Sequence, residues 1–247
     1  MFKNIKKFID KNVKTKKKII NRLSKNILLP KSLDEDLRKS FQTKEIINRF
    51  ILQYMEHLKS SQSKDKIYND IKNQFKDFEK NYIEKTLPKK LKEIPTNLYE
   101  ISNAKIFSST NLVTRSLSTT MGHLWERIAS CSDVALSTED EFDIKIKGVD
   151  IIFIKNSKPF YAQMKTLEGT LTGSQAKRSE AELSIHNNSI FVAAFDTGTG
   201  WTFNSNKIPR IKGKEFWDQI NIDYDFLLEN VKKMLKNIEN SFVELRD

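Results

Sequence analysis

The sequence predicts an α+β or α/β protein in which a helical N-terminal half precedes a mixed β-sheet flanked by helices. All seven glycines lie between Gly122 and Gly213, and a long glycine-free stretch suits helices, whereas connections between strands use glycine. Apolar residues recur every three or four positions before the glycine-containing part, and beyond residue 141 they form alternating or continuous runs. We therefore expect a basic amphipathic arm over 1–30, a helical region over 31–109 and a sheet-containing core over 110–247.

The arm carries most of the net charge. The chain has 43 Lys and Arg against 32 Asp and Glu, a net charge of +11, and residues 1–30 hold ten of the basic residues and one of the acids. Its apolar residues follow a helical spacing as far as Pro30, so the lysines occupy the opposite face. Three interpretations stay open: the helix lies on a phosphate backbone, lies on an anionic membrane, or packs on the rest of the chain with its lysines solvated.

Composition excludes several classes of protein. No run approaches the ~18 consecutive apolar residues that a membrane span needs, which excludes an integral membrane protein, and no cleavable signal is apparent. Between the two anionic partners considered for the arm, we expect a nucleic acid and no membrane. Cys131 is the only cysteine, which excludes an internal disulfide and an all-cysteine zinc site and suits a reducing, cytoplasmic setting. The positive charge makes a polyanion a plausible partner.

Further elements follow from the spacing of apolar residues. Amphipathic helices are expected over 34–59, 64–86, 110–131 and 223–242, with Pro88 and Pro95 interrupting the chain after the second of them. The C-terminal half is expected to contain strands over 142–147, 149–154, 160–166 and 189–195, a turn over 156–158 and a helix over 173–186. Gly148 permits a turn or a bulge between the first two strands.

One strand carries a charge that needs an explanation. Asp150 is the only charged residue in the apolar run from Val149 to Ile154, and a charge in such a strand is costly unless it is paired or binds a metal. In the next strand Gln163 and Lys165 lie two positions apart, so they share one face. If the two strands are neighbours, the three side chains converge. Carboxylate and amide oxygens are ligands suited to Mg²⁺, and a lysine beside them can orient a metal-bound water.

These residues carry a resemblance to a known family. The strings Gly148-Val149-Asp150-Ile151-Ile152-Phe153 and Phe160-Tyr161-Ala162-Gln163-Met164-Lys165-Thr166 resemble the core of the PD-(D/E)XK nuclease superfamily, in the variant in which glutamine replaces the second acid. The order helix, strand, turn, strand, helix, strand is that of the superfamily core. Glu126 matches a glutamate that members often carry on the helix before the Asp strand. Val149 stands where the name-giving proline of the motif is found.

The resemblance implies a restriction-endonuclease-like core and a Mg²⁺-dependent, sequence-specific DNA endonuclease, most simply a type II restriction enzyme. Asp150, Gln163 and Glu126 would be ligands of Mg²⁺, and Lys165 would position the attacking water. Double-stranded DNA would be the substrate, a cognate DNA methyltransferase the partner in a restriction-modification system, and a palindromic target would favour a homodimer. Two alternatives stay open: a non-catalytic nucleic-acid-binding protein of the same fold, and a repair or Mrr-like nuclease.

Polar and cationic residues after the Gln-x-Lys strand are candidates for DNA contacts. They lie at the start of the helix expected over 173–186, where main-chain amides can also meet phosphate, and Arg210 is a further candidate in a second basic segment. The candidates in the first segment are Thr172, Ser174, Gln175, Lys177 and Arg178.

Two other features allow a second interpretation. Asp196-Thr197-Gly198 resembles the loop of aspartic proteases, but such a site needs two aspartates, and no second copy occurs in this sequence; a turn at the end of a strand explains it as well. His123 lies three residues before Glu126, on the same face of the expected helix, where it either approaches the site or is an ordinary satisfied histidine.

Overall fold

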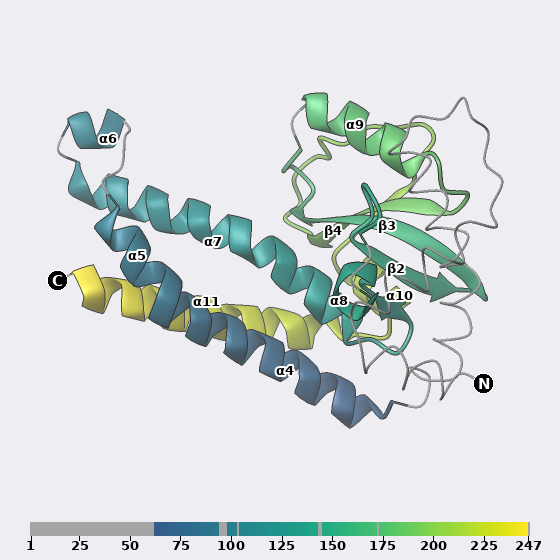
Figure 1. The fold of residues 1–247 in the computed structure, drawn as a ribbon, viewed down its shortest axis with the longest axis horizontal. Coiled ribbons are helices and arrows are strands. Elements are labelled where there is room, and N and C mark those ends of the chain that lie inside the picture. Colours follow the sequence, from purple (N-terminus) through teal and green to yellow (C-terminus); the bar gives the residue numbers. More distant parts are fainter. Residues whose placement is uncertain (1–61, 94–97, 103, 143–144, 172, 247) are drawn as a thin grey trace.

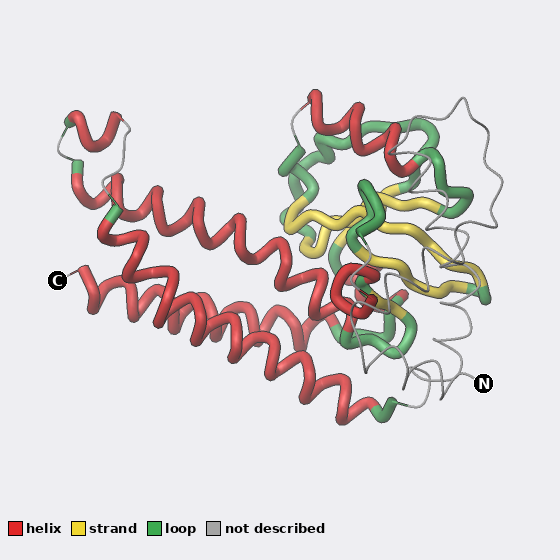
Figure 2. The backbone as a smooth tube through the Cα atoms, in the orientation of Figure 1, coloured by secondary structure: helices red, strands yellow, loops and turns green. Residues whose placement is uncertain are grey.

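The computed structural model describes residues 62–93, 98–102, 104–142, 145–171 and 173–246. The basic arm over 1–30 and the helix expected over 34–59 lie outside these ranges. Within them, an elongated group of helices lies beside a compact sheet module (Figure 1; Figure 2). A helical region followed by a mixed sheet flanked by helices is the α+β arrangement that the sequence predicts.

The described elements are, in chain order, α4 (Lys64–Asn81), the π-helical turn η2 (Tyr82–Thr86), α5 (Leu87–Lys92), α6 (Leu98–Ile101), α7 (Lys105–Ser130), β1 (Ala135–Leu136), α8 (Thr138–Phe142), β2 (Ile151–Lys155), β3 (Lys158–Leu167), α9 (Gly173–Leu183), β4 (Ser189–Phe195), β5 (Arg210–Lys212), α10 (Lys214–Gln219) and α11 (Tyr224–Arg246).

Helices α4, α5, α7 and α11 pack along one another, so the end of the chain returns to the helical half (Figure 1). The Ser63 hydroxyl caps α4 by accepting a hydrogen bond from the Lys66 amide, and the apolar stripe of α4 is buried. The interruption expected at Pro88 is wrong: α5 follows η2 directly and continues to Lys92, with Pro88 in its first turn, the part of a helix that tolerates proline best. The helices expected over 64–86, 110–131 and 223–242 are confirmed, and α7 runs continuously across the expected boundary at residue 110.

The sheet has five strands in the order β1-β2-β3-β4-β5. β1, β2 and β3 pair antiparallel, and β4 and β5 continue the sheet in parallel with β3. Asn156 and Ser157 both adopt positive φ and form the tight turn between β2 and β3. The parallel pairing of β3 with β4 requires a crossover connection, which α9 supplies.

The strand expected over 142–147 is wrong. Phe142 ends the short helix α8 instead, and Ile146 makes only an isolated bridge with Val149 across a turn that contains Gly148. Ser137 caps α8 by accepting a hydrogen bond from the Asp140 amide, and three acids occupy its first turn, where the helix dipole favours negative charge. These local signals outweigh the alternation of apolar residues.

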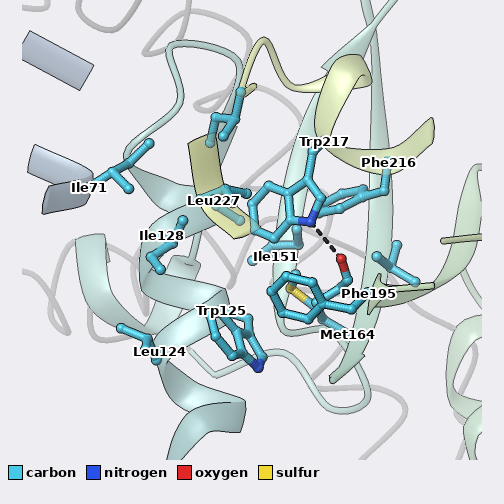
Figure 3. Close-up of a cluster of buried hydrophobic side chains, with 14 of the residues drawn as sticks. Ile71, Leu124, Trp125, Ile128, Ile151, Met164, Phe195, Phe216, Trp217 and Leu227 are labelled. Carbon is cyan, nitrogen blue, oxygen red and sulfur yellow. Dashed lines mark hydrogen bonds between the residues drawn. The ribbon is translucent and has the colours of Figure 1, made fainter. Parts of the chain in front are cut away.

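Each face of the sheet is covered by its own hydrophobic cluster. Trp125 of α7 and Trp217 of α10 pack on one face together with Ile151 and Met164 (Figure 3), and the Trp217 indole donates to the carbonyl of Ala194 at 2.6 Å. The opposite face packs against α9 and the segment before β5. Its members include Ile152, Tyr161, Leu183, Phe191 and Phe203.

Side-chain alternation in β3 decides which face carries the polar residues. Ala162 and Met164 point into the cluster beneath α7, so Gln163 and Lys165 point to the α9 side. The sheet therefore presents Gln163 and Lys165 of β3 next to the crossover helix.

Candidate active site

A cleft of about 640 Å³ opens between α7, the β2–β3 hairpin and α9. Four side chains from three separate elements meet at its walls: Glu126, Asp150, Gln163 and Lys165. These are the residues that the sequence singles out as a set. The remaining lining residues are Thr119, His123, Glu139, Lys145, Ile146, Gly148, Val149, Thr170, Leu171, Gln175, Arg178, Ser179 and Glu182.

Asp150 lies immediately before β2 and is fixed by the neighbouring strand. Its amide donates to the Ala162 carbonyl at 2.9 Å, and its Oδ2 accepts a hydrogen bond from the Met164 amide at 2.7 Å. The register that pairs Ile151 with Ala162 places Asp150 opposite Gln163 when it is extended by one residue. The predicted convergence of the two strands therefore occurs in the structure.

Glu126 reaches the cleft because its neighbour anchors α7 to the sheet. Trp125 is buried, and its indole N–H donates to the Thr166 hydroxyl at 3.1 Å. The next residue, Glu126, then points into the cleft, with its Oε2 3.5 Å from Nδ1 of His123. The i, i+3 relation predicted for His123 is confirmed, and His123 lines the same cleft.

Two of the carboxyl groups that line the cleft, those of Glu126 and Asp150, have raised pKa values and resist ionisation. Burial raises the pKa of Glu126 to about 7, and the adjacent Asp150 raises it as well, against opposing effects of His123 and Lys165. Burial also raises the pKa of Asp150, while the Met164 amide and Lys165 lower it. Raised pKa values of two adjacent buried carboxyl groups in a cleft are typical of functional sites, and a bound cation would offset the repulsion between their ionised forms.

Gln163 carries a buried oxygen atom that is available as a ligand. Its Oε1 atom is buried and accepts no hydrogen bond within the part of the chain that the structure describes, and an unsatisfied buried carbonyl costs about 1–3 kcal/mol. The described residues contain no group of three His, Cys, Asp or Glu side chains placed to hold a metal. A cation here would need the Gln163 oxygen beside Asp150 and Glu126. These hard oxygen donors are of the kind that Mg²⁺ prefers.

The candidate DNA contacts divide into three groups. Gln175 and Arg178 line the cleft, whereas Ser174 and Lys177 do not, and Thr172 lies outside the described residues. Arg210 also lies away from the cleft: its Nη1 donates to the carbonyl of Phe203, and its guanidinium lies 5.6 Å from the centre of the Trp201 ring.

Sequence reasoning found Gln175 and Arg178 on the opposite wall of the cleft but missed the acid that pairs with Arg178 and the pair formed by Lys145. Glu182 and Arg178, one turn apart on α9, form an ion pair of 2.9 Å there, and Lys145 pairs with Glu139 at 3.1 Å. The i, i+4 spacing of Glu182 and Arg178 was a visible signal for the pair itself, but nothing in the sequence shows that it faces Asp150.

A second charged cluster lies at the carboxyl ends of β3 and β4 and explains the Asp-Thr-Gly loop. Lys212 bridges the buried Glu168 at 3.2 Å and Asp196 at 2.6 Å, and Asp196 accepts from the Gly198 amide within its own turn. Burial favours a higher pKa for Glu168, but hydrogen bonds, including those from Lys212 and Thr197, lower it overall. These contacts favour the turn interpretation over a protease site.

Stability should depend on pH through Glu126. Its folded-state pKa of about 7 lies above the ordinary value, so the folded protein binds the proton more tightly and loses stability as pH rises from about 4.5 to 7. In the presence of a chelator, the free energy of unfolding of the wild-type protein should fall by roughly 2–3 kcal/mol between pH 5 and pH 8. The Glu126→Gln protein should not show this fall. Urea unfolding of both proteins at pH 5 and pH 8 measures this decline. If the free energy of unfolding changed equally in both proteins between the two pH values, the pKa of Glu126 would be an ordinary one.

Comparison with known proteins adds no identification: no model of a known protein family matches the chain, and no curated protein matches it significantly. Within the described ranges, none of the helices combines the length and apolar character required to cross a membrane.

Proposed function

We propose that this protein is a Mg²⁺-dependent DNA endonuclease of the PD-(D/E)XK kind that cuts double-stranded DNA at specific sequences. The observation that carries the proposal is the meeting of Glu126, Asp150, Gln163 and Lys165 in one cleft, with the Gln163 oxygen buried and unpaired. The first three supply oxygen donors for a divalent cation, and the fourth supplies a cation for the scissile phosphate.

The topology around the cleft supports the proposal. The preceding helix α7, the antiparallel pair β2–β3, the crossover helix α9 and the parallel strand β4 follow the order that the sequence resemblance implies. Asp150 comes from the start of β2, Gln163 and Lys165 from the middle of β3, and Glu126 from the preceding helix. All four residues of the site therefore come from one continuous segment of the chain, residues 126–165.

Each residue has a role that follows from its position. Bound Mg²⁺ would polarise the phosphodiester and lower the pKa of a bound water. Asp150, held by the Met164 amide, and the Gln163 carbonyl oxygen would hold the cation against the sheet. Glu126 would provide a further oxygen, directly or through water. Lys165 shares the face of Gln163 and orients the attacking water while it offsets charge on the phosphate.

Further parts of the proposal concern the biological setting. A restriction enzyme of type II acts beside a DNA methyltransferase that protects the host, and a palindromic target matches a homodimer. Cleavage of DNA places the protein where DNA is found, which in a bacterium is the cytoplasm.

Digestion of unmethylated phage DNA with Mg²⁺ tests the proposal. We expect a reproducible set of discrete fragments that a chelator abolishes. A smear would indicate a nuclease without sequence specificity, such as a repair enzyme. Intact DNA with Mg²⁺ and with Mn²⁺, on methylated and unmethylated substrates, would contradict nuclease activity and favour a binding protein of the same architecture.

A further inference from the structure

The wall of the cleft that faces the β2–β3 hairpin carries an arginine side chain that is paired with a nearly buried acid. Arg178 lies on α9 and lines the cleft, and its side chain is 71% exposed. Its partner Glu182 is 10% exposed, so a nearly buried carboxylate holds a largely exposed guanidinium. A carboxylate in such surroundings is costly unless it is paired, and here the described partner is Arg178.

Glu182 is fixed from its other side by the turn before β2. A Cβ atom on Gly148 would lie 2.5 Å from the Glu182 Cβ and 2.8 Å from its Oε2, and Gly148 adopts φ +73°. The turn therefore packs its main chain directly against the acid, an approach that only glycine allows. Glu182 is confined between this turn and Arg178, so its carboxylate stays in position.

The pairing leaves the outer part of the guanidinium for a second anion. The contact with Glu182 Oε1 uses the Nε–H of Arg178, and a guanidinium has five N–H donors in a planar fork. The two terminal amino groups remain for a ligand in the cleft, where they match the geometry of phosphate oxygens.

We propose that Arg178, positioned by Glu182, binds a second phosphate of the nucleic acid whose scissile phosphate lies at Asp150 and Lys165. The inference rests on the proposed function and adds a phosphate subsite on the α9 wall. Glu182 is a positioning residue because it acts through Arg178. Four acids and only three lysines or arginines line the cleft. A nucleic acid that enters it is therefore repelled by the excess of acids unless a positive side chain such as Arg178 contacts its phosphates.

Binding of short fluorescent duplexes to Asp150→Ala protein, measured over a range of salt concentrations, tests the subsite without cleavage. Each phosphate contact contributes about 0.9 to the slope of log K against log salt, so Arg178→Gln should reduce the slope by about 0.9. Lys158→Gln is the matched control, because it removes one positive charge at the far end of the hairpin, where Lys158 is exposed. It should leave the slope unchanged.

Glu182→Gln gives the sharper result because two explanations predict opposite signs. If Glu182 only adds negative charge, its removal should strengthen DNA binding. If it positions Arg178, binding should weaken by about tenfold, the value of one charge-assisted hydrogen bond. In the Arg178→Gln background, the same change should have little further effect, because the residue through which it acts is gone. Thermal unfolding of each variant verifies that it is folded.

The outcomes separate the subsite from the proposed function. Equal slopes for Arg178→Gln and Lys158→Gln, or tighter binding by Glu182→Gln, would overturn the subsite and leave the nuclease proposal intact. A loss confined to particular duplex sequences would also overturn it, since phosphate contacts weaken binding uniformly. Absence of duplex binding by the Asp150→Ala protein would overturn both.

Discussion

Replacing Asp150 or Lys165 with alanine should lower the DNA cleavage rate at least ~10³-fold while duplex binding changes little. Asp150 is the carboxylate that the Met164 amide holds at 2.7 Å, and without it the proposed cation would keep only the oxygens of Gln163 and Glu126. A catalytic metal stabilises the transition state by several kcal/mol, and each 1.36 kcal/mol is a factor of ten in rate. Lys165→Ala removes a positive charge that lines the cleft and that, in the proposed reaction, would face the scissile phosphate.

Rates of fragment appearance and duplex affinity, measured on the same preparations, separate chemistry from binding. Lys155→Ala is the control, because Lys155 ends β2 at the opposite end of the strand from Asp150 and is exposed. It should cleave at the wild-type rate. Cleavage by the Asp150→Ala protein at that rate would exclude this cleft as the active site.

Trp125→Ala should reduce the free energy of unfolding by about 4 kcal/mol, as is usual when a large buried aromatic residue is truncated. Trp125 is 1% exposed and packs edge-on against Phe195 with ring centres 4.7 Å apart. Its indole also joins α7 to Thr166 of β3. The loss would be a large part of the 5–15 kcal/mol by which most domains are stable.

Urea unfolding followed by far-ultraviolet circular dichroism measures this effect, and Trp125→Phe is the matched control. Phenylalanine keeps an aromatic ring against Phe195 but cannot donate to Thr166, so its cost should be roughly 1–2 kcal/mol. A loss below 1 kcal/mol for Trp125→Ala would mean that α7 is held to the sheet by other contacts.

The central strands could be predicted because they are buried on both faces. Every residue of β4 is buried, and only its first residue, Ser189, is polar. The first three residues of β2 are also apolar and buried, so these apolar runs identify both strands without knowledge of the tertiary structure. β1 and β5 span two and three residues, too few to establish a period. They are strands only because a longer neighbour supplies hydrogen bonds.

The floor of the candidate site could be predicted for a similar reason. Gln163 and Lys165 are two residues apart in one strand, and the turn before β3 is too short to place β2 anywhere but beside it. The proximity of Gly148 to Glu182 joins a turn to a helix more than thirty residues later. It depends on how α9 packs on the sheet, which no local pattern specifies.

A calorimetric titration with Mn²⁺ tests most directly whether the cleft is a divalent-cation site. It is done at pH 8, where Glu126 is ionised. We expect the wild-type protein to bind a cation that Asp150→Asn and Gln163→Leu proteins do not bind, with each variant unfolding as cooperatively as the wild type. Binding of equal stoichiometry and affinity in all three proteins would place the cation elsewhere. No binding by the wild-type protein, with or without DNA, would contradict a metal-dependent nuclease site formed by these residues.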